Sequence, residues 1–243
     1  MSFTGEIVDE RGVVERRFAL DVSGRHVPGV LWTPSGAAGS RPLVLLGHGG
    51  SAHKRSPYML AMARMLVRRC GFAAAAIDQQ EHGARRSSAA DDGEGLEWIR
   101  RRLFTPEATA NAVEEWKATI DWLHEQDGVG VDRLGYWGWS MGTVFGIPLV
   151  AAEPRVSAAV LGLAGSRLGG LMAPAGQISC PVLFCWQLED ELMTRESVLE
   201  LFDAIGSREK LLHANPGKHV EAPRRQYEAT VSFLGERLGA ATA

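Results

Sequence analysis

Cysteine is scarce in this sequence. Its 243 residues include three, Cys70, Cys180 and Cys185, which form no C-x-x-C pair and leave one thiol unmatched. This spacing argues against a disulfide framework and against a structural zinc site. Each cysteine adjoins an apolar run, so we expect all three to be small, buried apolar residues.

Long hydrophobic runs and a targeting segment are also missing. Nowhere do about eighteen apolar residues follow one another. The start of the chain, Met1 to Glu6, has no positive stretch that leads into an apolar one. A transmembrane helix and a secretory signal peptide are therefore not expected, and the sequence predicts a cytoplasmic protein without a membrane partner.

The chain has no excess of positive charge. Its formal net charge is −3, with 45% hydrophobic and 23% charged residues, as in an ordinary globular protein. This balance gives no indication of nucleic acid as a partner, and it indicates no particular oligomeric state. We expect a single domain over residues 1–243, because α/β folds often reach this size around one core.

The glycine patterns of nucleotide sites are absent too. No G-x-G-x-x-G follows a predicted strand and no G-x-x-x-x-G-K-[ST] occurs, so the frameworks that bind phosphate groups are lacking. His48, His53, His82 and His219 are of a type that binds zinc, but they show no H-E-x-x-H or comparable spacing. We therefore expect neither a cofactor nor a metal.

What the sequence does contain is an alternation of strand and helix patterns. Two β-rich stretches, Val13–Asp21 and His26–Trp32, flank the turn Val22-Ser23-Gly24-Arg25 and predict an antiparallel hairpin. The apolar runs that follow are typical of buried strands, and they are Pro42–Leu46, Phe72–Ile77, Arg133–Trp137, Ala158–Leu163, Pro181–Trp186 and Lys210–His213.

Segments of helical period separate these runs. They comprise Tyr58–Leu66, a helix beginning near Pro106 and containing Val113–Leu123, a helix after Ser140, Thr194–Ile205 and Pro223–Leu238. The alternation predicts an α/β fold in which a mostly parallel central sheet carries the N-terminal hairpin and has helices on both faces.

One stretch does not fit the alternation. Residues 83–105 contain the polar run Ala84–Gly95 and then a short helical pattern with Trp98, Ile99 and Leu103. A connection of this length is often a short lid or binding loop, and the alternative is a solvated surface excursion.

The segment Gly138-Trp139-Ser140-Met141-Gly142 carries the strongest indication of chemistry. An apolar strand precedes it, an apolar helix follows it, and glycines flank the serine where a sharp turn leaves little room for a Cβ atom. Such a turn strains the backbone and exposes the serine oxygen. We predict that Ser140 is a nucleophile; the alternative is a serine that only caps the helix.

At this point the sequence resembles the α/β-hydrolase superfamily, and within it the dienelactone-hydrolase-like and small esterase branches. The resemblance covers nearly the whole chain from Arg41 onward. It implies the α/β-hydrolase fold and the chain order nucleophile, acid, histidine.

The resemblance implies the acid just after Pro181–Trp186. There Gln187-Leu188-Glu189-Asp190 matches the family pattern G-x-x-D except at the glycine. We predict that Asp190 is the acid, with Glu189 as the alternative. Its carboxylate would hold the histidine in one tautomer and stabilise the imidazolium, without taking the proton itself.

The histidine is expected in the loop after the last strand. Pro216-Gly217-Lys218-His219 matches the family's P-G-x-H pattern. The imidazole of His219 can accept the serine proton and return it to the leaving group near neutral pH. His213 lies within the predicted strand and is interpreted as structural.

An oxyanion hole needs two backbone N–H groups. One is expected from Met141, the residue after the nucleophile. The run His48-Gly49-Gly50-Ser51 resembles the family's oxyanion loop, and by that match Gly50 donates the other, with Ser51 as the alternative. His48 is interpreted as a scaffold residue, and Asp78 and His82 as braces of loops near the site.

The remaining candidates concern substrate binding. We expect Trp139 and Ser51 to contact the substrate, while Trp137 and Trp186 are interpreted as packing residues. Two interpretations are open for a group of arginines, attraction of an acidic substrate or a solvated face; they are Arg85, Arg86, Arg100, Arg101 and Arg102.

Together these features predict a serine hydrolase that cleaves carboxylic esters, lactones or thioesters of small to moderate size through an acyl-enzyme on Ser140. A peptidase or amidase of small peptides is the alternative within the enzymes, since the same groups can cleave amides. A non-catalytic ligand-binding protein with the same fold is the alternative outside them.

Overall fold

A mixed nine-stranded sheet forms the centre of the computed structural model, which describes residues 3–36, 39–87 and 101–239. The strands are β1 (Gly5–Val8), β2 (Val13–Val22), β3 (Arg25–Pro34), β4 (Arg41–Gly47), β5 (Ala73–Ile77), β6 (Val129–Gly138), β7 (Val156–Gly162), β8 (Val182–Gln187) and β9 (Lys210–Asn215). Their order in the sheet is β1-β2-β3-β5-β4-β6-β7-β8-β9. The first three and β5 pair antiparallel, whereas β5, β4 and all later strands are parallel.

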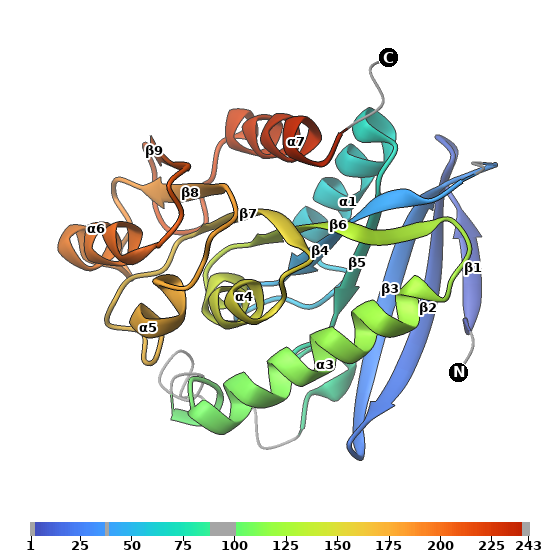
Figure 1. Ribbon diagram of the computed structural model, residues 1–243, viewed down its shortest axis with the longest axis horizontal. Coiled ribbons are helices and arrows are strands. Elements are labelled where there is room, and N and C mark those ends of the chain that lie inside the picture. The colour runs from blue at the N-terminus through green and yellow to red at the C-terminus, as the bar shows by residue number, and fades with distance from the viewer. Residues whose placement is uncertain (1–2, 37–38, 88–100, 240–243) are drawn as a thin grey trace.

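Helices cover both faces of this sheet (Figure 1). They are α1 (Pro57–Cys70), the 3₁₀ turn η1 (Gly83–Arg85), α3 (Pro106–His124), α4 (Met141–Ala152), α5 (Met172–Ala175), α6 (Arg195–Ala204) and α7 (Arg224–Leu238). The mostly parallel sheet between two helical layers, predicted from the alternation of apolar patterns, is confirmed.

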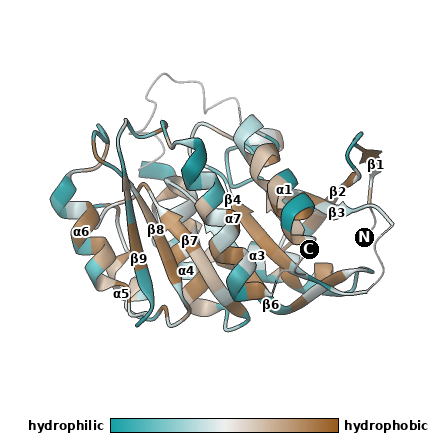
Figure 2. Cartoon of the chain, turned by 90° about the horizontal axis from the view of Figure 1, so that it is seen from above, coloured by the Kyte–Doolittle hydropathy of each residue, from teal (hydrophilic) through white to brown (hydrophobic). Residues whose placement is uncertain are grey.

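Both faces of the central strands are apolar. Leu43 and Leu45 of β4 belong to the core under α3 and α4, while Val44 and Leu46 belong to the core under α1 and α7. All four side chains are fully buried. This explains why the strands are near-continuous apolar runs, and Figure 2 shows these strands as hydrophobic bands between helices whose exposed sides are more hydrophilic.

The N-terminal hairpin is longer and tighter than predicted. The strands extend to Val22 and Arg25, so the loop is only Ser23-Gly24, whose φ angles are 52° and 75°. Positive φ at both loop residues matches the twist of the strands they join. The strand β1 was not predicted because Ile7 and Val8 at this edge of the sheet are 53% and 55% exposed and show no buried face.

Most helix ends agree with the sequence signals. Pro106 occupies the first turn of α3, and the Thr105 hydroxyl accepts the N–H of Ala108 at 3.1 Å.

The short helix α5 was not predicted, because four residues are too few to show a period.

One expectation about the cysteines is wrong. All three are free, and Cys70 and Cys185 are buried, but Cys180 is only partly buried. It lies before Pro181, outside strand β8, and packs against the core with part of its side chain exposed.

The segment 83–105 is described only in part. Its first residues form η1, and Thr105 caps α3. Residues 88–100, which include Trp98, Ile99 and Arg100, lie outside the described residues, and so does most of the predicted lid.

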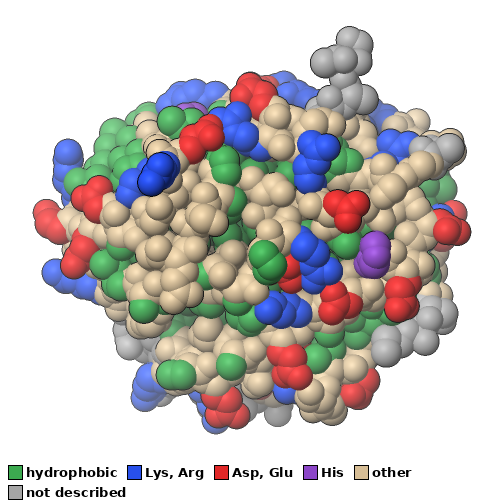
Figure 3. Space-filling model, in the orientation of Figure 1, with side chains coloured by type: hydrophobic (Ala, Val, Ile, Leu, Met, Phe, Trp, Pro, Cys, Tyr) green, Lys and Arg blue, Asp and Glu red, His purple; other side chains and the backbone are tan. Residues whose placement is uncertain are grey.

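The surface carries both signs of charge. Figure 3 shows basic and acidic side chains interspersed over the face in view. None of the helices in the described part of the chain has the length and hydropathy needed to cross a bilayer.

Candidate active site

Ser140 sits at the sharp turn between β6 and α4. Its φ and ψ angles are 57° and −121°, a strained conformation for a residue with a Cβ atom. Its N–H donates to the Gly162 carbonyl of the neighbouring strand β7 at 3.0 Å, which anchors the turn to the sheet. The strained turn expected from the motif is therefore present.

The two glycines of the motif are required by close backbone contacts. A Cβ atom at Gly142 would lie 2.3 Å from the carbonyl oxygen of Gly47 on β4, and one at Gly138 would lie 2.7 Å from the Gly142 carbonyl oxygen. These distances are well below van der Waals contact, so the turn packs against β4 only if both positions lack a side chain.

Two residues that the sequence analysis missed support the turn. The Thr143 hydroxyl oxygen lies 2.8 Å from the Gly138 carbonyl and 2.6 Å from the Gly162 carbonyl, and it accepts the Gly162 N–H at 2.8 Å. The buried Tyr136 hydroxyl donates to the Gly142 carbonyl at 2.5 Å. A threonine and a tyrosine within otherwise apolar segments could have indicated this supporting role from the sequence, because a buried hydroxyl needs a hydrogen-bond partner.

His219 connects the serine to a carboxylate. Its Nε2 atom lies 2.9 Å from Ser140 Oγ, and its Nδ1 atom lies 2.8 Å from Asp190 Oδ2. The Asp190 side chain is 0% exposed and that of His219 is 6% exposed. The three predicted triad residues, which follow β6, β8 and β9, are thus brought together at one edge of the sheet.

The three neighbouring acids have different partners. Asp190 Oδ1 accepts the N–H groups of Leu192 at 2.9 Å and Met193 at 3.1 Å, so this carboxylate is held from both sides. The exposed Glu189 carboxylate binds the Gly217 N–H and does not touch the His219 ring.

Glu191 supports the histidine from outside the triad. Its carboxylate accepts the backbone N–H of His219 at 3.0 Å, and this hydrogen bond lowers the pKa of Glu191. The sequence analysis named Glu189 only as an alternative acid and did not single out Glu191, whereas both carboxylates hold the loop that carries His219.

The loop after β4 presents two free amides. The Gly49 N–H donates to the Tyr58 hydroxyl at 2.7 Å, and the Ala52 N–H donates to the Gly49 carbonyl at 3.2 Å. Among the described residues, the N–H groups of Gly50 and Ser51 have no acceptor. Met141 is the first residue of α4, where N–H groups have no partner within the helix.

His48 lies beneath this loop and is fully buried. Its Nδ1 atom contacts the Gly49 carbonyl at 2.9 Å, and its Nε2 atom accepts the Gln79 N–H at 3.0 Å. Burial, and then the charge of His82, lower the pKa of His48 to about 3. His48 is therefore neutral at ordinary pH and holds the loop, which agrees with its interpretation as a scaffold residue.

A pocket of about 370 Å³ opens at Ser140 and His219. Its other walls include the loop Gly49–Ala52 and five apolar or aromatic side chains, Tyr58, Trp139, Leu163, Val220 and Tyr227. The expected substrate contacts Trp139 and Ser51 both line it, and no Lys, Arg, Asp or Glu occurs among its described lining residues.

Aromatic rings form much of this wall. Trp139 packs edge-on against Trp137 and against Tyr227, with ring centroids 5.1 Å apart in both pairs. Trp137 is fully buried, as expected for packing. Trp186 is also buried, with the Arg195 guanidinium 5.3 Å from its ring centroid.

Of two residues next to the serine turn, Leu163 lines the pocket and Met141 does not. The Met141 side chain packs with Leu103 and Phe145 and does not line the pocket, whereas its backbone remains at the turn. Leu163, which the sequence analysis did not single out, follows β7 with a φ of 53° and lines the pocket. No local pattern marks such a residue, because its place depends on the neighbouring strands.

The arginines expected near the substrate, apart from Arg100, which lies outside the described residues, do not line the pocket. Arg85 is bound to the buried Glu115, and the exposed Arg86, Arg101 and Arg102 are not among the described lining residues. Across residues 3–36, 39–87 and 101–239, no group of three or more His, Cys, Asp or Glu side chains is placed to hold a metal ion.

Comparison with known proteins identifies the family. A model described as the dienelactone hydrolase family matches residues 53–216. The chain belongs to this family. It is therefore a hydrolase by family, and the resemblance inferred from its motifs is confirmed. No match was found among curated proteins.

Comparison with solved structures supports the same fold. A PEG-bound cold-adapted esterase from an Arctic intertidal metagenomic library is 39% identical, with a TM-score of 0.87, and the match covers 98% of this chain and 100% of that one. The α/β-hydrolase fold is thereby confirmed.

More distant structures show the fold alone. The acetyl xylan esterase from Paenibacillus sp. R4 is 17% identical with a TM-score of 0.78, over 98% of this chain and 88% of that one. The dienelactone hydrolase from Anabaena variabilis is 20% identical with a TM-score of 0.68, over 92% and 95%.

Proposed function

We propose that this hydrolase is a serine esterase, which cleaves carboxylic esters, including lactones and thioesters, through an acyl-enzyme on Ser140. The observation that carries the proposal is the continuous contact from Ser140 Oγ through both ring nitrogens of His219 to Asp190. A serine with a base in contact, and a buried carboxylate behind the base, is the arrangement that activates a hydroxyl.

The first half of the reaction forms the acyl-enzyme. Asp190 accepts the Nδ1–H of His219, so the lone pair of Nε2 faces Ser140. His219 removes the serine proton as Ser140 Oγ attacks the carbonyl carbon. The N–H groups of Met141 and Gly50 stabilise the resulting oxyanion. When the intermediate collapses, the ester C–O bond breaks and His219 gives its proton to the leaving alcohol.

The second half repeats these roles with water. His219 removes a proton from water, the hydroxide attacks the acyl carbon, and the same two N–H groups stabilise the second oxyanion. Ser140 then leaves with the proton held by His219. Each step uses water and groups of this chain.

The pocket supports small, uncharged substrates. Its described lining combines aromatic and aliphatic side chains with the imidazole of His219 and contains no Lys, Arg, Asp or Glu. A carboxylate in the substrate would lose its hydration there without a compensating cation. A volume of about 370 Å³ also lies near the lower end for small-molecule sites.

The test is the Ser140→Ala variant. We expect it to abolish hydrolysis of p-nitrophenyl acetate and labelling by a fluorophosphonate, while thermal unfolding stays close to that of the wild type. Retention of either reaction would reject the proposal. A panel of p-nitrophenyl esters of increasing acyl length should show loss of kcat/KM for long acyl groups, and matched p-nitroanilides decide between esterase and amidase.

The non-catalytic alternative has its own outcome. If the wild-type protein binds a small ester but neither hydrolyses it nor reacts with the fluorophosphonate, it is a binding protein. The cytoplasmic location and the single domain over residues 1–243 remain predictions from sequence.

A further inference from the structure

The buried side chain of His82 makes two contacts that a neutral histidine cannot satisfy together. Its Nε2 atom lies 2.7 Å from the Gly50 carbonyl oxygen, and its Nδ1 atom lies 2.8 Å from the Gln80 carbonyl oxygen. Carbonyl oxygens only accept hydrogen bonds, and a neutral imidazole carries one N–H. Both bonds form at once only when the ring is doubly protonated.

The bond to Gly50 controls the direction of the next amide. The described residues contain no cis peptide bond, so the N–H of Ser51 points away from the Gly50 carbonyl that His82 holds. In the same way, His48 holds the Gly49 carbonyl, and the Gly50 N–H points away from it. The two histidines therefore fix the two peptide planes on either side of Gly50.

This control matters because the loop is intrinsically permissive. Gly49 and Gly50 have no Cβ atoms to limit their backbone angles. The amides of Gly50 and Ser51 are also the ones in this loop that lack an acceptor, and both residues line the pocket at Ser140. Without its carbonyl contacts the loop would lose the fixed direction of its donors.

We propose that His82 is a positioning residue which, as an imidazolium, holds the Gly50 carbonyl and so keeps the oxyanion-hole amide of Gly50, and the free amide of Ser51 that follows it, directed at the reacting carbonyl. The inference rests on the proposed function, since an oxyanion arises there only if Ser140 attacks an acyl group. His82 touches neither the substrate nor the reacting atoms and acts through Gly50.

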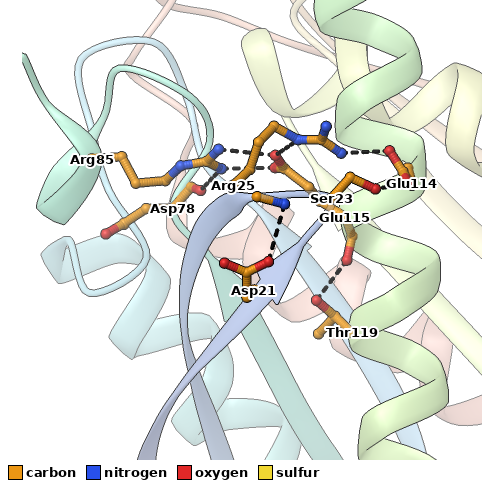
Figure 4. A network of polar contacts seen from close by, with 9 residues as sticks. Asp21, Ser23, Arg25, Asp78, Arg85, Glu114, Glu115 and Thr119 are labelled. Atoms are coloured by element: carbon orange, nitrogen blue, oxygen red, sulfur yellow. Dashed lines mark hydrogen bonds and ion pairs between the residues drawn. The ribbon is translucent and has the colours of Figure 1, made fainter.

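The segment that carries His82 is itself anchored. Arg85 donates to both carboxylate oxygens of the buried Glu115, at 2.7 and 2.9 Å, and to the Asp78 carbonyl at 3.0 Å, as Figure 4 shows. The Asp78 carboxylate accepts the N–H groups of Lys54 at 2.9 Å and Ala84 at 2.8 Å. Because these bonds lie before and after His82, its ring has a fixed base from which to hold Gly50.

The charges nearby allow one cationic ring. The titratable groups on the described parts of the two loops and on η1 are Asp78, Glu81 and Arg86 from the loop of His82, His48, His53, Lys54 and Arg55 from the loop after β4, and Arg85 from η1. Lys54 pairs with Asp78, and Arg85 pairs with Glu115. The His48 ring lies 5.2 Å from that of His82 and is held neutral by its contact with the Gln79 N–H. Of the two rings, His82 is therefore the one that is doubly protonated.

The two histidines of the reaction then need opposite protonation states. His219 works as a base only when it is neutral, whereas His82 holds Gly50 through both bonds only when it is charged. We therefore expect the pH profile of kcat to change when His82 is replaced by a residue that carries no charge.

Three variants test the inference. His82→Ala removes both bonds, and His82→Gln keeps one amide donor for Gly50 but carries no charge at any pH. His26→Gln removes an exposed histidine from β3 and serves as the control. The measurements are kcat and KM for p-nitrophenyl acetate from pH 5 to 10, and the inhibition constant of an aryl trifluoromethyl ketone, which forms an oxyanion on the serine.

For His82→Ala we expect kcat to fall by about 10- to 100-fold with KM changed less than about threefold, because one oxyanion donor contributes on the order of 10²–10³ in kcat. The inhibition constant of the trifluoromethyl ketone should rise by a similar factor. His82→Gln should change the pH profile of kcat, which a merely structural role would leave as in the wild type.

Two results would overturn the inference: a kcat within about twofold of wild type in His82→Ala, or an unchanged pH profile of kcat in His82→Gln. If His82→Ala does not fold, His82→Gln alone decides. Failure of the proposed function gives a different result, because the wild type itself would then not be labelled by the fluorophosphonate. If only the inference about His82 fails, the wild type and all variants should still be labelled at Ser140.

Discussion

Replacing Asp190 by asparagine separates the two acids that the sequence left as alternatives. In the structure, Asp190 Oδ1 accepts two backbone N–H groups while Oδ2 accepts from His219 Nδ1. An asparagine that keeps its oxygen on the two N–H groups turns its NH₂ group toward His219. The ring must then present a lone pair at Nδ1 and carry its proton on Nε2, where it cannot accept the proton of Ser140.

The size of the effect follows from this change of tautomer. The Asp190 side chain is 0% exposed, so water cannot compensate for the reversed donor. Loss of the correct tautomer in a triad lowers kcat by about 10⁴-fold, which is about 5.4 kcal/mol at 1.36 kcal/mol for each factor of ten. KM should change little, since Asp190 does not line the pocket.

The assay is hydrolysis of p-nitrophenyl acetate by Asp190→Asn, with Glu189→Gln as the matched control. Glu189 holds the Gly217 N–H and not the imidazole, so its amide variant should keep kcat within about tenfold of wild type. If Asp190→Asn keeps that much activity, or if Glu189→Gln loses as much as Asp190→Asn, the assignment of the acid is wrong.

Further predictions concern folding. Glu115→Ala leaves two arginines without their buried partner. It should lower the free energy of unfolding by about 3–5 kcal/mol and Tm by roughly 6–20 °C in a calorimetric scan. A Tm shift under about 2 °C would contradict this. Gly142→Ala should fail to reach the native circular dichroism spectrum, because its Cβ atom would lie 2.3 Å from a β4 carbonyl oxygen, whereas Gly5→Ala, with open space around it, should fold normally. Burial raises the pKa of Asp78, but the hydrogen bonds from Lys54 outweigh it and keep that pKa below the ordinary value of 3.8. Its contribution to stability is therefore present above about pH 4 and lost as pH falls through the folded pKa, so Lys54→Met should move the acid-unfolding midpoint to higher pH; an unchanged midpoint would refute the ion pair's role.

Much of the fold was available from local patterns. Strands β4 to β8 were predicted because both faces of each are buried, which makes them uninterrupted apolar runs. The helix α3 was predicted from its apolar period and from Pro106 in its first turn, and the structure adds side-chain caps at Thr105 of α3 and Thr194 of α6. The exposed strand β1 and the short α5 lack such a period and were missed.

The chemical groups of the site were likewise predicted from sequence. Ser140 stands between glycines that the turn requires, and His219 follows a Pro-Gly turn after the last strand. Both signals are local, since they depend on backbone geometry within a few residues. Asp190 and its neighbour Glu189 both matched the position of the acid, because sequence does not specify which way adjacent side chains point.

Only the tertiary structure decided the contacts between distant segments. It placed Asp190, and not Glu189, against His219, and it brought the His82 ring to the Gly50 carbonyl, 32 positions earlier in the chain. Such contacts depend on strand register and on the packing of loops at the carboxyl edge of the sheet. The sequence of a single segment contains no information about either. The sequence by itself determined the strands, the helices and the reacting groups, because these follow from local period and turn geometry; their mutual orientation follows from packing.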